Sequence, residues 1–157
     1  MIEIILRVIG ELIQEVIKSV GVRSRLKIVC GWAHEVNGDG AGNFLALWVK
    51  IINPTPSSIY FERLEAIDQS GQVFFPSIYR IKTGDEIKPY RNIVGAIPCG
   101  HITKNSHPKE LRIYDSTERK YSVSSRMLRK VVDELEAERE RLERLNMNVH
   151  PTHPQPK

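Results

Sequence analysis

Apolar side chains occupy both faces of the segment FLALWVKIINPTPSS, residues 44–58. In an extended chain successive side chains point to opposite faces. One face carries Leu45, Leu47, Val49 and Ile51, and the other carries Phe44, Ala46, Trp48, Lys50 and Ile52. Such a strand is typical of a sheet that is covered on both sides. Pro54 lacks the N–H that a sheet requires, so the strand ends at Asn53. The pattern predicts a central strand in which Leu47, Trp48, Val49 and Ile51 are buried.

A helical pattern covers residues 2–20, IEIILRVIGELIQEVIKSV. Nine aliphatic side chains recur at steps of three and four and form one stripe around Ile9 and Ile13. Gly21 follows at the position where a glycine ends a helix. We expect this stripe to pack on the rest of the chain or on a second copy. The alternative is a helix lying on a membrane surface, although its polar face is not rich in Lys or Arg.

The rest of the chain reads as short strands separated by turns, followed by a second helix. Turn residues recur at short intervals, and no helices alternate with the strands, which favours antiparallel sheets over a parallel α/β fold. The predicted strands are 23–34, 44–52, 59–68, 72–75, one or two within 77–95, 111–114 and 121–123, and the loops include 37–43 and 98–108.

These elements divide the chain into four parts. Residues 1–21 form the N-terminal helix and residues 22–123 form a sandwich domain. Residues 124–146 contain a helix that Ser124 or Ser125 can cap. The Pro-rich tail, residues 147–157, is expected to be disordered.

Three motifs between Leu26 and Val123 resemble a known group of proteins. They are IINPTPSSIYF with the glycine-tipped hairpin that follows it, TGDEI, and LRIYDSTERKYSV before a terminal helix. These motifs resemble small bacterial or phage-associated proteins, generally uncharacterised, in which an immunoglobulin-like domain follows an N-terminal helix. The resemblance implies a mainly β fold, namely an immunoglobulin-like antiparallel β-sandwich of about seven strands flanked by an amphipathic and a charged helix. It implies no catalytic residues. The hairpin at Asp115 has Thr117-Glu118-Arg119 where a glycine is usual.

Cys30, Trp48 and Cys99 follow the order found in antibody domains. Those domains carry a tyrosine two residues before the second cysteine, whereas this chain has Ile97 there. Pro98 and Gly100 also place Cys99 in a loop. We therefore expect no disulfide and interpret Cys30 as a small buried apolar side chain.

The candidate metal ligands are Cys99, His101 and His107, with His34 as a fourth. Their spacing lacks the closely paired ligands of structural zinc sites. No nucleophile motif, metalloprotease motif or phosphate-binding loop occurs in the chain. The sequence therefore predicts no cofactor, no metal and no enzymatic activity.

A basic stretch runs from residue 119 to residue 130. It contains Arg119, Lys120, Arg126, Arg129 and Lys130, with no acid between Glu118 and Asp133. These side chains could contact phosphates, so a nucleic-acid-binding module is one alternative function. Only Tyr121 could stack on bases, and the acids from Asp133 onward offset the charge.

The helix that follows carries a partial heptad pattern. Leu128, Val131, Leu135, Leu142 and Leu145 occupy apolar seam positions, and Glu138 interrupts the seam. The pattern predicts a short coiled-coil contact that joins two copies through Leu135 and Leu142. The alternative is a single helix that leans on the sandwich by its first half.

Composition changes this picture little. The chain has 157 residues, a formal net charge of +4 and two cysteines, which is ordinary for one globular domain. Charged side chains interrupt the N-terminal apolar stripe, so we expect neither a signal peptide nor a membrane span, and we expect a cytoplasmic location. The sequence favours a non-enzymatic protein that acts through protein–protein contacts, with nucleic acid and a membrane surface as the alternatives.

Overall fold

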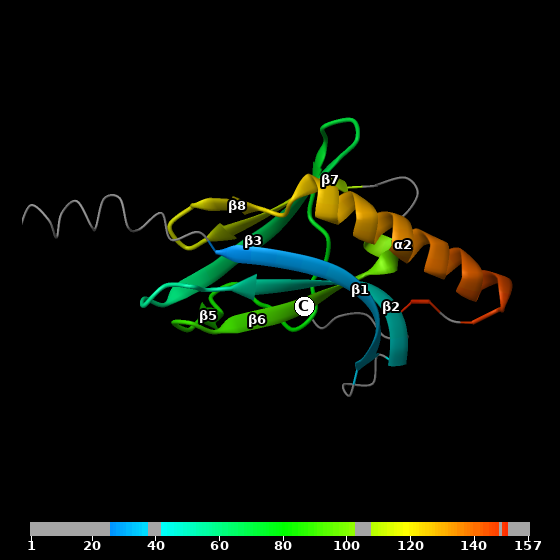
Figure 1. Ribbon diagram of the computed structural model, residues 1–157, viewed down its shortest axis with the longest axis horizontal. Helices are drawn as coiled ribbons and strands as arrows, with labels where there is room; N and C mark the ends of the chain where they lie inside the picture. Colours follow the sequence, from blue (N-terminus) through cyan, green and yellow to red (C-terminus); the bar gives the residue numbers. More distant parts are fainter. Residues whose placement is uncertain (1–25, 38–41, 103–107, 148, 151–157) are drawn as a thin grey trace, which may run out of the picture.

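The computed structural model describes residues 26–37, 42–102, 108–147 and 149–150. Within these residues two antiparallel sheets, of three and five strands, pack with one C-terminal helix (Figure 1). The expected mainly β, antiparallel architecture is therefore confirmed. The predicted N-terminal helix, with Ile9 and Ile13, lies outside the described residues, as does the tail from residue 151.

The first sheet contains β1 (Lys27–Asn37), β2 (Gly42–Ile52) and β6 (Asn92–Pro98), in the order β1-β2-β6. β1 and β2 form a long hairpin whose pairing runs from Lys27 opposite Ile52 to Asn37 opposite Gly42. β6 pairs with the other edge of β2. The segment predicted to be a central strand is therefore central in its sheet.

The second sheet has the order β4-β3-β7-β8, and a further short strand, β5 (Glu86–Ile87), pairs with the start of β3. Its members are β3 (Ile59–Asp68), β4 (Val73–Phe74), β7 (Pro108–Asp115) and β8 (Lys120–Ser122). Both predicted hairpins, β3–β4 and β7–β8, are present. β7 begins three residues earlier than the sequence predicts, because Pro108 already lies opposite Asp68.

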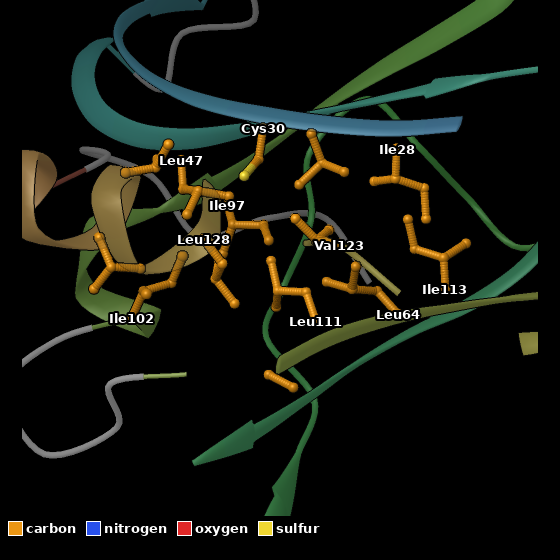
Figure 2. Close-up of a cluster of buried hydrophobic side chains, with 14 of the residues drawn as sticks. Ile28, Cys30, Leu47, Leu64, Ile97, Ile102, Leu111, Ile113, Val123 and Leu128 are labelled. Atoms are coloured by element: carbon orange, nitrogen blue, oxygen red, sulfur yellow. The ribbon is translucent and has the colours of Figure 1, made fainter. Parts of the chain in front are cut away.

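The core lies between the two sheets. The side chains of Leu45, Leu47, Val49 and Ile51 on β2 are completely buried. They face Leu64 on β3 and the apolar side chains of β7, and Leu128 enters from the helix (Figure 2). The prediction for Leu47, Val49 and Ile51 is confirmed.

Trp48 is half-buried rather than buried, because it points away from this core. Its indole lies across β1, where Gly31 is its direct cross-strand neighbour. A Cβ added at Gly31 would lie 2.3 Å from Trp48 Cζ2, so only glycine leaves room for the ring. The tryptophan therefore belongs to the outer face of the first sheet.

Asn53 fixes the chain where β2 ends. It is fully buried, and its Nδ2 donates to the carbonyls of Ser57 (2.7 Å) and Ile87 (2.8 Å). Its Oδ1 accepts from the N–H (3.0 Å) and the hydroxyl (2.7 Å) of Thr55. A buried amide with all these bonds made is well tolerated in a core. The sequence marked this position only as the end of a strand.

The C-terminal helix α2 (Ser125–Arg144) covers one end of the sandwich and contacts β1, β2 and β7 (Figure 1). A short 3₁₀ turn, η1 (Cys99–His101), contacts it as well. Ser124 is the N-cap residue, and its side chain makes no capping hydrogen bond. The buried residues of α2 are Leu128, Val131, Val132, Leu135, Arg139 and Leu142.

Leu135 and Leu142 are only 3 % and 2 % exposed and belong to the core of their own chain. The sequence had assigned these two leucines to a contact between copies. The apolar seam instead packs on the sandwich, which provides far more apolar area than a second short helix would. The contact extends beyond the first half of the helix, as far as Leu142.

The chain after α2 also differs from the expectation of a disordered tail from residue 147. Val149 is buried, and its carbonyl accepts a hydrogen bond from the Leu45 N–H (3.2 Å). The Cys99 thiol lies 3.4 Å from the same oxygen. Val149 thus occupies the edge of β2 beyond Pro98, the last residue of β6.

Truncating Leu47 to alanine should lower the free energy of unfolding by about 2–5 kcal/mol, because it removes apolar contacts from a close-packed core. Urea unfolding monitored by circular dichroism measures the change. Val73→Ala is the matched control, since Val73 is 43 % exposed, and it should shift the free energy by less than about 0.5–1 kcal/mol. Equal effects of the two substitutions would contradict the assignment of the core.

Candidate functional site

The predicted interaction residues are not brought together at one site. Arg126, Arg129 and Lys130 are exposed on the first turns of α2. Lys120 is the first residue of β8, and Arg119 precedes it in the β7–β8 turn, whereas α2 follows the other end of β8. The basic stretch is therefore divided into two small groups in space.

Acidic side chains share the helix surface with these cations. Asp133 is exposed and follows Arg129 and Lys130 by four and three residues, which places it beside them. Lys130 Nζ lies 3.9 Å from Glu134 Oε1. The surface of α2 is consequently a mixture of charges rather than a continuous basic patch.

A large hollow lies beside Arg129. It is open to solvent, has a volume of about 1070 Å³, and is bounded by the β3–β4 turn, the start of β7, the end of β8 and α2. Its lining is polar and apolar in similar measure. The lining residues are Asp68, Gln69, Ser70, Pro108, Lys109, Glu110, Ser122, Val123, Ser125, Arg129, Val132 and Asp133.

Two carboxylates of the hollow are held by local hydrogen bonds. Asp68 Oδ1 accepts from the Ser70 hydroxyl (2.6 Å) and from the N–H of Ser70 and Gln72. Glu110 Oε1 accepts from Arg112 Nε (2.9 Å) and from the Ser122 hydroxyl (3.0 Å). Hydrogen bonds from Ser70 lower the pKa of Asp68, and the bond from Arg112 lowers the pKa of Glu110.

This arrangement suits binding better than catalysis. Carboxylates with lowered pKa values are weak bases, so they activate the neighbouring hydroxyls poorly. Lys109 and Arg129 form no ion pair with any residue in the described part of the chain. Their charges, together with the apolar part of the hollow's lining, can hold a polypeptide segment that carries an acidic group.

The side chain of Asp115, where β7 enters the β7–β8 turn, is almost completely buried. Its Oδ1 accepts from the N–H and hydroxyl of Thr117 and from the N–H of Arg119. Its Oδ2 accepts from the Tyr121 hydroxyl at 2.8 Å. Burial acts to raise the pKa of Asp115, but the bonds from Thr117 and Tyr121 outweigh it and lower that pKa. Burial, with a smaller effect of Asp115, raises the pKa of Tyr121 to about 12.

The same turn replaces the usual glycine with Glu118. Glu118 adopts φ +60°, a conformation that glycine tolerates best. Its carboxylate pairs with Arg63 Nη1 at 2.8 Å. The hydrogen bonds of Asp115 and the Arg63–Glu118 ion pair thus hold the turn, so the carboxylate of Asp115 has a structural role.

Both cysteines are free and buried. Burial raises the pKa of each thiol to about 11, which makes both unreactive at neutral pH. Cys30 belongs to the core, as expected from its sequence context. Within the described ranges no group of three or more His, Cys, Asp or Glu side chains could hold a metal ion. His107, one of the candidate ligands, lies outside those ranges.

Polar bonds connect α2 to β1, and the sequence did not indicate them. Trp32 Nε1 donates to Glu134 Oε2 at 3.0 Å. His34 Nε2 lies 3.1 Å from Glu138 Oε1, and Glu138 also accepts two bonds from Arg141 (2.7 and 2.8 Å). Arg141, and then His34, lower the pKa of Glu138 to about 2. The partner residues are about a hundred positions apart, so helical spacing alone does not reveal them.

Arg139 is a second charged residue that the heptad pattern concealed. It is 8 % exposed, and its Nη2 donates to Glu136 Oε1 at 2.6 Å. Its Nε lies 3.7 Å from Glu143 Oε1. A buried guanidinium requires such carboxylates, because leaving it unpaired would be costly.

Among the described residues, no helix has both the length and the apolar character needed to cross a membrane. Comparison of the chain with family models, curated proteins and solved structures gives no match.

Glu138→Gln should destabilise the protein most at pH 6 and progressively less toward pH 2. The folded carboxyl has a pKa of about 2, below the value of about 4.3 for an unfolded glutamate. Its contribution is therefore complete above pH 4.3 and disappears as the pH falls through 2. At pH 3 the difference in unfolding free energy between the wild type and Glu138→Gln should be about half of that at pH 6.

Urea unfolding of both proteins between pH 2.5 and pH 6 measures this difference. Arg141→Gln provides the reciprocal test, because Arg141 is the largest cause of the lowered pKa. The difference in unfolding free energy between the wild type and Arg141→Gln should become smaller in the same way as the pH falls. A difference that stays constant over the whole range would refute the role of this ion pair.

Proposed function

We propose that this protein is a non-enzymatic protein-binding module. The observation that carries the proposal is the hollow between the β3–β4 turn and the start of α2. Its walls come from β7, β8, α2 and the β3–β4 turn, and its lining combines apolar surface with two cations that have no ion pair within the described residues. These are the properties of a site that holds a segment of another polypeptide.

Strand order supports a finer description of the fold as immunoglobulin-like. The first, second and fifth strands of such a sandwich share one sheet, and the third, sixth and seventh share the other. Setting aside the two-residue β5, this chain has β1, β2 and β6 in one sheet and β3, β7 and β8 in the other. Its fourth strand, β4, pairs with β3, whereas the fourth strand of a constant-type domain joins the first sheet. Sandwiches of this kind commonly carry binding sites at their ends.

The other partners expected from the sequence have less support. The cations of α2 are interspersed with Asp133 and Glu134, which weakens the case for nucleic acid. A homo-oligomer would need a contact surface that does not include Leu135 or Leu142, since both leucines are buried. A cytoplasmic location and the membrane-surface alternative depend on the N-terminal residues and remain proposals.

Site-specific photo-crosslinking tests the binding site. A benzoylphenylalanine placed at Lys109, which is exposed and lines the hollow, should form a discrete protein adduct in lysate of the source cells. The same group at Lys82, exposed on the turn before β5, is the matched control and should form none. Arg129→Glu should reduce the Lys109 adduct several-fold, because it reverses a charge at the rim.

Two results would contradict the proposal. Equal labelling from Lys109 and Lys82 would show that the hollow has no preference for a partner. Salt-dependent retention of the protein on DNA, lost in Arg129→Glu while the adduct persists, would instead favour nucleic acid.

A further inference from the structure

The outer face of the first sheet is apolar, although it points away from the core. The pairing of β1, β2 and β6 places three residues in each cross-strand row. Of the twelve positions only Lys27, Lys50 and Asn92 are polar. The rows are Ala33–Ala46–Pro98, Gly31–Trp48–Ala96, Val29–Lys50–Val94 and Lys27–Ile52–Asn92.

Described elements cover this face only at one end. Phe44 and Tyr79 stack there, with ring centroids 5.3 Å apart, over Ala46 and Ala96. The apolar side chains of the remaining rows, Val29, Trp48, Ile52 and Val94, pack against neither of the two buried clusters. A solvent-facing side of an antiparallel sheet normally alternates to polar residues, so this face requires a cover.

The residues that precede β1 have the dimensions of such a cover. The predicted helix of residues 2–20 would be about 28 Å long and about 10 Å wide. The four rows extend about 20 Å along the strands, and the three strands together are about 10 Å wide. One helix is therefore long and wide enough to cover the rows that Phe44 and Tyr79 leave open.

We propose that the N-terminal segment, residues 2–20, docks its apolar stripe on the outer face of its own β1-β2-β6 sheet. Residues 21–25 separate the segment from Leu26, and five residues span up to about 17 Å. That length allows the chain to reverse before β1 and to run back over the sheet, which lies about 10 Å below the helix axis. An attachment this short makes docking on the same chain far more favourable than docking on a free copy.

The direction of the chain determines which residues meet. The returning helix places Val16, Ile17 and Val20 near the row of Lys27 and Ile52. Ile9 and Ile13 then lie over Trp48, whose indole fills the space above Gly31.

Charge supports the proposed docking. Lys50 interrupts the apolar face near its middle and Lys27 lies at its end. The C-terminal half of the segment carries Glu15 next to Leu12, at the edge of its stripe. The lysine stems can lie under the helix, and the ammonium group of Lys50 can reach this carboxylate at its edge.

Fluorescence of Trp48 tests the proposal in the full chain. Trp32→Phe leaves Trp48 as the single tryptophan of the protein. Acrylamide should quench it slowly, and Ile9→Asp with Ile13→Asp should raise the quenching constant several-fold. The matched control, Glu11→Asp with Gln14→Asp on the opposite side of the helix, should leave the constant unchanged. A preserved cooperative urea transition shows that the sandwich is folded in each variant.

Light scattering and vesicle sedimentation define the remaining outcomes. Docking on the same chain requires a mass that stays monomeric from micromolar to submillimolar concentration while Trp48 is protected. Protection that appears only together with a dimer mass would overturn the proposal in favour of a second copy. Exposed Trp48 combined with sedimentation on vesicles of anionic phospholipid would overturn it in favour of a membrane surface. Quenching unaffected by the Asp substitutions would overturn it outright.

Discussion

The structure depends on a strand that must be covered on both sides. β2 carries an unbroken apolar row on its inner face and an apolar row interrupted only by Lys50 on its outer face, and every inner side chain from Leu45 to Ile51 is completely buried. The inner row must be covered by a second sheet. The two sheets leave one end of the core open, and α2 covers that end. Burial of four such side chains provides roughly 6–12 kcal/mol of the apolar driving force. The apolar side chains of the outer row, which include Trp48, must be covered in the same way.

Polar groups fix the geometry that this burial leaves undetermined. Asn53 ties the end of β2 to Ile87 of β5, and Asp115 ties the β7–β8 turn to Tyr121. Glu134 and Glu138 connect α2 to Trp32 and His34 of β1. The last two bonds hold the middle of α2 against β1. The hollow lies between the first turns of α2, the start of β7 and the end of β8.

The sequence predicted the parts of the fold that depend on local pattern. Alternation identified β2, glycine and proline positions identified the hairpins, and helical spacing identified α2. It could not distinguish a helix seam that packs on its own sandwich from one that pairs with a copy, so Leu135 and Leu142 were assigned to the wrong surface. Asn53, Asp115 and Glu138 act through partners brought near by folding, and one sequence does not show such pairs. The hollow is likewise a product of tertiary packing, since its lining comes from four elements.

The most direct test of the account is whether residues 2–20 cover the outer face of β2. Nuclear Overhauser effects in the full chain, with isoleucine and valine methyl groups labelled, report contacts within about 5–6 Å. The account predicts cross-peaks from the methyl groups of Ile9 and Ile13 to the Trp48 ring, and from the segment to Val29 and Val94. A sample that mixes labelled and unlabelled chains should show no intermolecular cross-peaks. Absence of all contacts between the segment and this face would contradict the account.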